Sequence, residues 1–85
     1  MIYMMNEKQI LEGFKTKDQE IASVLYATGQ IINSTSWENG ACYFLYENKS
    51  QCDEIVANYF RGQIKLNAKV VWDAIKTIKG IIYRR

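Results

Sequence analysis

Residues 30–48 read QIINSTSWENGACYFLYEN and are the stretch that decides the fold. Two runs rich in β-branched and aromatic residues flank the dipeptide Asn39-Gly40. This dipeptide favours a type I′ turn, because both of its residues tolerate a positive φ angle. The stretch therefore predicts a β-hairpin with a two-residue loop.

The register that follows from this turn gives the hairpin two different faces. Pairing Glu38 with Ala41 decides every later pair, and directly opposed residues share a face of the sheet. We expect one face to form the core, with Ile31, Trp37, Cys42, Phe44 and Tyr46 on it. The other face is half polar and carries Ile32, Ser34, Ser36, Tyr43 and Leu45. Tyr43 and Leu45 are thus a second candidate interface, for another protein or for a second copy of the chain.

Apolar residues at helical spacing predict helices on both sides of the hairpin. We expect them at about 17–28, from Asn48 or Ser50 to about 61, at roughly 68–82 and, as a short element, at 6–12. Thr16 and Gln19 fit a capping box at the start of the first long helix. Asn67 is a suitable N-cap for the last one.

Residues 63–66 alternate polar and apolar side chains, which predicts a short third strand at a sheet edge. The fold class is therefore α+β, with a small antiparallel sheet and about three helices packed on one of its faces. We expect a single domain over residues 1–85, in which residues 1–13 are the least defined segment.

Composition excludes several kinds of chemistry. The 85 residues contain no histidine, so a histidine general base, a histidine-containing triad and a histidine metal ligand are all excluded. Cys42 and Cys52 are expected to be buried apolar residues, and the single glycines fit no phosphate-binding loop. We therefore expect a protein without catalytic activity, metal or cofactor. The sequence shows no signal peptide or membrane span, so we expect a cytoplasmic protein with no membrane partner.

Charge is distributed unevenly along the chain. Residues 1–60 carry four lysines and eight carboxylates, whereas residues 61–85 carry seven basic side chains and one carboxylate. At 100° per residue, the basic and aromatic side chains of the last helix fall on one flank. We call this set, with the two arginines that follow it, the basic flank: Lys69, Trp72, Lys76, Lys79, Tyr83, Arg84 and Arg85.

Three interpretations of the basic flank are open: a solvated helix side, a surface for an acidic protein, or a surface for nucleic acid. Of the two binding interpretations, we favour a protein partner. The sequence lacks the motifs of nucleic-acid-binding modules, and the acidic residues 1–60 would repel phosphates. A structural homodimer is a further alternative.

Several short motifs together resemble a family of small domains of unknown function from phages, prophages and Gram-positive bacteria. The motifs are FKTKD at 14–18, Ala22 with Leu25, Gly29, YFLYEN at 43–48, Tyr59 with Gly62, and KGIIY at 79–83. The resemblance covers about residues 14–83 and implies a phage or mobile-element setting. Small proteins in that setting often bind and block host machinery. The resemblance thus implies an inhibitor that occupies a host protein, for example a nuclease of a defence system, in the manner of an anti-CRISPR protein.

Overall fold

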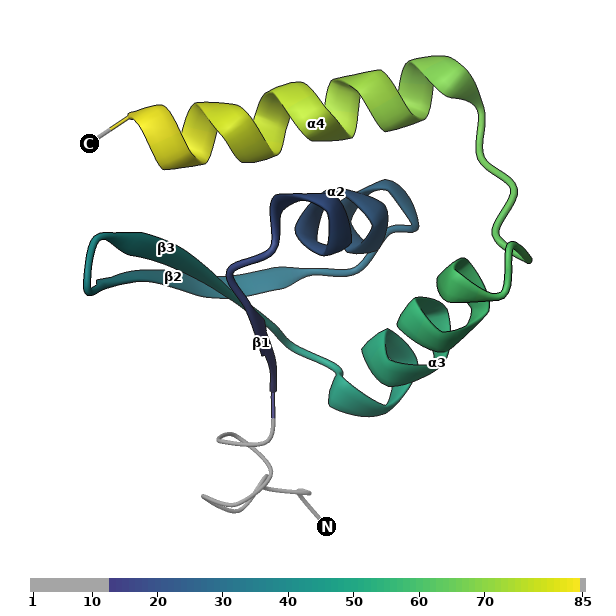
Figure 1. Ribbon diagram of the computed structural model, residues 1–85, viewed down its shortest axis with the longest axis horizontal. Helices are drawn as coiled ribbons and strands as arrows, with labels where there is room; N and C mark the ends of the chain where they lie inside the picture. The colour runs from purple at the N-terminus through teal and green to yellow at the C-terminus, as the bar shows by residue number, and fades with distance from the viewer. Residues whose placement is uncertain (1–12, 85) are drawn as a thin grey trace, which may run out of the picture.

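The computed structural model describes residues 13–84, which form a three-stranded sheet and three helices (Figure 1). The elements are β1 (Phe14–Thr16), α2 (Gln19–Ala27), β2 (Ile32–Glu38), β3 (Ala41–Tyr46), α3 (Lys49–Phe60) and α4 (Ala68–Tyr83). The sheet is antiparallel with the strand order β1-β3-β2. The predicted α+β class is confirmed. The short helix predicted at 6–12 lies outside the described residues.

The hairpin of β2 and β3 turns at the predicted position. Asn39 and Gly40 have φ angles of 52° and 80°, as a type I′ turn requires. Trp37 lies opposite Cys42, also as predicted. The local turn chemistry therefore decides the first half of the register.

Further from the turn, the predicted register is wrong. An irregularity between Ile32 and Ser34 places Ile32 opposite Tyr46, where the sequence predicted Asn33. An extra residue in one strand shifts the following side chains to the other face. Ile32 therefore packs against the core, while Ile31, which was predicted to be in the core, is 61% exposed.

The third strand also differs from the prediction. Residues 63–66 form no strand, and β1 occupies the second edge of β3, with Phe14 opposite Tyr46. The alternation in 63–66 has another cause: Ile64 and Leu66 are half-buried against the helices. A period of two shows only that alternate side chains are buried. Here they are buried although the backbone of the segment does not pair with a strand.

Asparagine and aspartate side chains begin the helices. The Oδ1 atoms of Asn48 and Asn67 accept hydrogen bonds of 3.0 and 2.8 Å from backbone amides in the first turns of α3 and α4. Asn67 is the predicted cap, and Asn48 is one of the two predicted starts of α3. The predicted cap of α2 is wrong. Asp18 caps that helix, since its Oδ1 accepts from the amide of Ile21 at 3.0 Å. Thr16 instead accepts from the amide of Asp18, so the helix begins two residues later than predicted.

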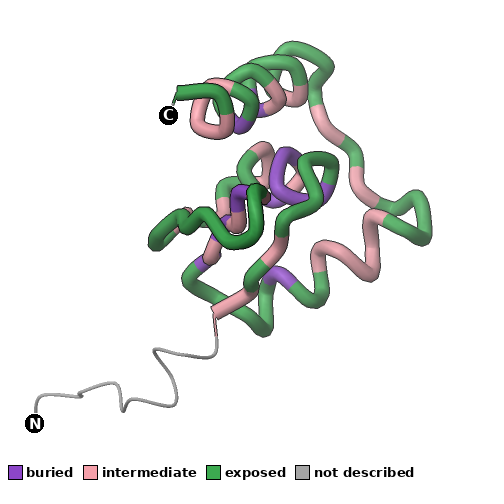
Figure 2. The backbone as a smooth tube through the Cα atoms, turned by 60° about the vertical axis from the view of Figure 1, so that its left-hand side comes forward, coloured by how far each residue is buried: buried purple, intermediate pink, exposed green. Residues whose placement is uncertain are grey.

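The core lies where α2 is enclosed between the sheet and α4 (Figures 1 and 2). Its buried members are Ile21, Ala22, Leu25, Cys42, Phe44, Tyr46, Cys52 and Ile78. The Tyr46 hydroxyl donates a 2.5 Å hydrogen bond to the carbonyl of Ala22, which joins β3 to α2. The predicted core positions of β3 are thus confirmed, but Trp37 is 38% exposed because the turn end of the hairpin extends beyond α2.

Candidate functional site

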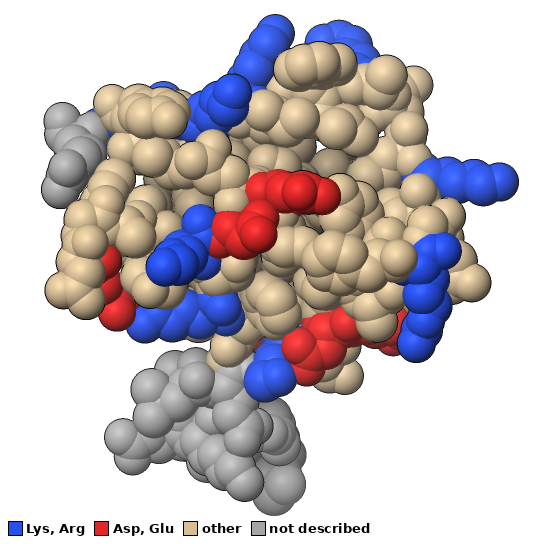
Figure 3. Space-filling view, in the orientation of Figure 1, with Lys and Arg blue, Asp and Glu red and all other residues tan. Residues whose placement is uncertain are grey.

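The basic flank lies on the solvent side of α4. Trp72 is 62% exposed and Tyr83 is 73% exposed, while Ala74 and Ile78 on the opposite side of the helix are buried. Lysine and arginine atoms gather along α4 at the top of Figure 3. The predicted members from Lys69 to Tyr83 are therefore brought together on α4, Arg84 is the C-cap of this helix, and Arg85 lies outside the described residues.

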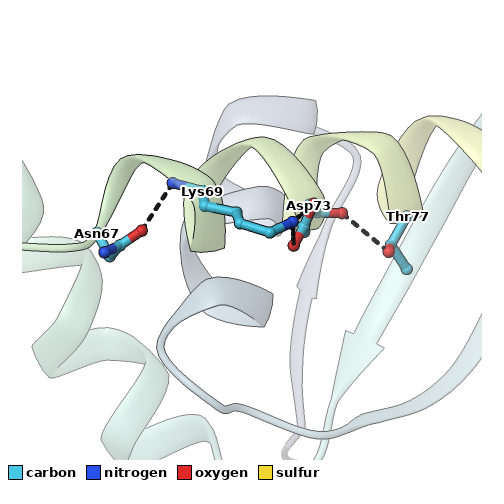
Figure 4. A network of polar contacts seen from close by, with 4 residues as sticks. All are labelled: Asn67, Lys69, Asp73 and Thr77. Carbon is cyan, nitrogen blue, oxygen red and sulfur yellow. Dashed lines mark hydrogen bonds and ion pairs between the residues drawn. The ribbon is translucent and has the colours of Figure 1, made fainter.

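The charge of the flank is concentrated toward its second half. Lys69 Nζ lies 3.1 Å from Asp73 Oδ2 in an ion pair four residues apart, and Thr77 donates to the Asp73 carbonyl at 2.9 Å (Figure 4). This exposed pair adds little stability, but it offsets the Lys69 charge. Within residues 13–84, Lys76 and Lys79 have no ion pair. These two lysines are the cations most available to a partner.

An apolar groove of about 440 Å³ opens beside this flank. The surface is recessed below α4 in the view of Figure 3. Six apolar side chains line the groove: Val24 and Ala27 of α2, Ile64 and Leu66 of the connector 61–67, and Val71 and Ile75 of α4. A half-open hollow with this lining resembles a ligand-binding site more than an ordinary protein surface.

Polar groups occur at the margin of the groove. The Tyr59 hydroxyl donates a hydrogen bond to the Glu20 carboxylate, which connects α3 to α2 and raises the pKa of Tyr59. Ser23 donates to the Gln19 carbonyl at 2.7 Å. Lys79 completes the α4 wall. The groove is therefore apolar inside, with one engaged carboxylate and one lysine at its margin.

Exposed aromatic rings flank the groove. Phe60 is 72% exposed, and its ring centroid lies 5.4 Å from that of Tyr59, which lines the groove. On α4, Trp72 follows the wall residue Val71, and Lys79 belongs to both the wall and the basic flank. The groove and the basic flank are consequently parts of one continuous surface.

Sequence reasoning missed the groove, although two signals of it were visible. Val71 and Ile75 were predicted as core residues of the last helix, but both are only half-buried because they face the groove. The alternation of Ile64 and Leu66 was the other trace. Neither pattern indicates a groove without knowledge of how α2 and α4 pack together.

The second candidate interface is a polar surface on the sheet face opposite α2. Tyr43 and Leu45 are half-buried there around a hollow of about 260 Å³. Lys15 Nζ lies 4.9 Å from the centroid of the Tyr43 ring and 2.8 Å from Glu38 Oε2. The hydrogen bond from Lys15, supported by one from Ser36, lowers the pKa of Glu38. Because these polar groups already interact with one another, this face has fewer groups available to a partner than the groove has.

The two cysteines belong to the core. Cys42 and Cys52 are both buried, and no disulfide joins them. Burial, with a smaller contribution from Asp53, raises the pKa of Cys52 to about 11, so this thiol stays protonated near neutral pH. Residues 13–84 contain no group of three or more potential metal-ligating side chains. No helix among these residues has the length and apolarity needed to cross a membrane.

Fold and site together define a small α+β domain with an apolar groove beside a basic, aromatic helix flank. Residues 12–84 match the model of a family described as a domain of unknown function, DUF5659, and the chain belongs to this family. No curated protein and no solved structure was found to match the chain. Membership in a family of unknown function agrees with the resemblance found in the sequence.

Proposed function

We propose that the chain is a non-catalytic protein that acts by binding another protein, with the apolar groove and the basic flank as its binding surface. The observation that carries this proposal is the 62% exposed ring of Trp72 beside a half-open apolar groove. Exposing such a ring to water is unfavourable, and tryptophan is the residue most enriched among side chains that dominate protein interfaces.

A protein partner is favoured over nucleic acid by the kind of surface present. Asp73 offsets the charge of Lys69, so only a few cations remain on the flank. Nucleic-acid binding depends on neutralising several phosphates, and the apolar side chains of a groove cannot do so. A gel shift that weakens steeply as salt rises would favour the nucleic-acid alternative. Self-association through Tyr43 and Leu45 stays a prediction.

The setting of this function is also a proposal. The resemblance to domains from phages and mobile elements supports a host protein as the partner, and inhibition of that protein, for example a defence nuclease, as the outcome. Two buried thiols without a disulfide suit a reducing compartment, which supports action in the cytoplasm.

Charge reversal on the flank tests the proposal. In a pull-down from bacterial lysate with mass-spectrometric identification, Lys76→Glu with Lys79→Glu is expected to reduce capture of the specific partner by about tenfold or more. The reason is that both lysines are exposed and have no ion pair within residues 13–84. The matched control is Lys15→Glu with Lys49→Glu, which changes the net charge equally but lies away from α4.

The control also tests the opposite sheet face, because Lys15 contacts Tyr43. Unchanged capture by the α4 double variant would show that the flank is not the interface. Loss of capture with the control variant alone would place the interface on the open face of the sheet.

A further inference from the structure

We infer that the apolar groove receives an amphipathic α-helix of the partner that carries carboxylates beside its apolar stripe. This inference rests on the proposed function, because it names the chemistry of the element that the partner presents. Its support comes from the length of the groove, the backbone of its walls and the charge at its margin.

The length of the groove matches about two helical turns. Its α4 wall runs from Val71 through Ile75 to Lys79, which spans about 12 Å at 1.5 Å per residue. Val24 and Ala27 line the groove from α2, which crosses beneath α4 in Figure 1. A two-turn helix about 10 Å wide has a volume of roughly 900 Å³, about twice the 440 Å³ of the groove. The occupant therefore lies along the groove and inserts only its apolar side chains.

The walls favour a helix over an extended strand. Most of the lining residues belong to α2 and α4, whose backbone groups are already hydrogen-bonded within those helices. An occupant finds few backbone partners there and must satisfy its own amides and carbonyls. A helix does so internally and presents apolar residues at i, i+3 or i+4, and i+7.

The charge at the margin favours an acidic occupant. Lys79 lies in the wall, and Lys76 lies on the adjoining flank of the same helix. Of the nearby carboxylates, Asp73 is offset by Lys69, whereas Glu20 accepts from Tyr59 and Asp18 caps α2, and these two keep their charge on the α2 side of the groove. Carboxylates on the side of the occupant that faces α4 would meet the two lysines, whereas lysines in those positions would be repelled.

Synthetic peptides test this inference on the full chain by fluorescence anisotropy. The probe is a fluorescein-labelled helical peptide with leucines at i, i+4 and i+7 and glutamates beside them. One matched probe has the same composition scrambled so that no apolar stripe forms, and another has lysines in place of the glutamates. We expect saturable binding of the acidic amphipathic probe. Both matched probes should bind more weakly than it does, by about tenfold or more.

Two variants link that binding to the groove. Ala27→Phe fills the groove and is expected to weaken binding of the acidic probe by about tenfold. Val70→Phe adds the same ring at an exposed position of α4 outside the groove lining, so it should leave this binding unchanged. Lys79→Glu is expected to reverse the preference from the acidic to the basic probe. An unfolded variant would bind neither probe, so this reversal separates a charge effect from loss of structure.

The inference is overturned if the acidic probe fails to bind, if the scrambled probe binds equally well, or if Ala27→Phe has no effect. Testing Ala27→Phe in the pull-down distinguishes failure of the groove inference from failure of the proposed function. If Ala27→Phe keeps the partner and the double variant Lys76→Glu with Lys79→Glu loses it, the groove inference fails while the flank remains the interface. If both keep the partner, the proposed function fails as well.

Discussion

Replacing Phe44 by alanine is expected to destabilise the domain by about 3–5 kcal/mol. Phe44 is fully buried in the central strand β3 and is one of the two largest side chains of the core. The loss combines the transfer free energy of the ring with the cost of the cavity that remains. Because a domain of this size has a total stability of about 4–13 kcal/mol, this loss is a large fraction of the total, and a domain at the low end of the range would be mostly unfolded at room temperature.

Urea denaturation followed by circular dichroism measures this effect. Phe60→Ala is the matched control: it removes the same ring from a position that is 72% exposed, and it should change stability by less than about 0.5 kcal/mol. Equal losses from the two substitutions would contradict the placement of the core between β3 and α2.

Stability is expected to fall in alkaline solution. Burial, with smaller contributions from Cys52 and Tyr26, raises the pKa of Tyr46 well above its ordinary value of 10.0, and burial raises the pKa of Cys52 to about 11. The folded state therefore keeps protons that the unfolded state releases, so unfolding is favoured as the pH rises. The Cys52 contribution is lost between about pH 9 and 11, and that of Tyr46 from about pH 10 upward.

Each of these groups should lower the free energy of unfolding by about 1.4 kcal/mol per pH unit within its range. The measurement is the urea midpoint at a series of pH values from 8 upward. Tyr46→Phe should be less stable at pH 7, because it loses the hydrogen bond to Ala22, but its decline above pH 10 should be shallower. A Tyr46→Phe profile parallel to that of the unmodified chain would contradict a buried, protonated Tyr46.

Local chemistry explains the parts of the fold that the sequence predicts well. The turn at Asn39-Gly40 and the caps at Asn48 and Asn67 each depend on a few neighbouring residues. The bulge near Asn33 does not. Ile31 and Ile32 are chemically identical, and only packing against the core selects which of them is buried. The failure therefore occurs where tertiary contacts outweigh local preference.

The pairing of β1 with β3 was missed for a similar reason. Its three residues are too short to show a period of two, and its pairing with β3 joins positions about thirty residues apart. Residues 63–66 alternate more regularly, but they form no strand, because alternation reports only which side chains are buried.

The two parts of the site differ in how far the sequence predicts them. The basic flank lies on one helix, so helical periodicity alone places Trp72 beside Lys76. The groove needs α2, α3, the connector 61–67 and α4 together. No pattern along the chain records that arrangement, because it depends on how α2 packs against α4.

The central claim is that the groove and the basic flank together form the partner-binding surface. Hydrogen–deuterium exchange of the full chain, alone and in complex with its captured partner, tests this claim most directly. We expect slower exchange in the complex across α2, residues 61–67 and residues 71–79 of α4, with β2 and the Tyr43–Leu45 segment unchanged. Protection of β2 and residues 43–45, with α4 unchanged, would contradict the claim.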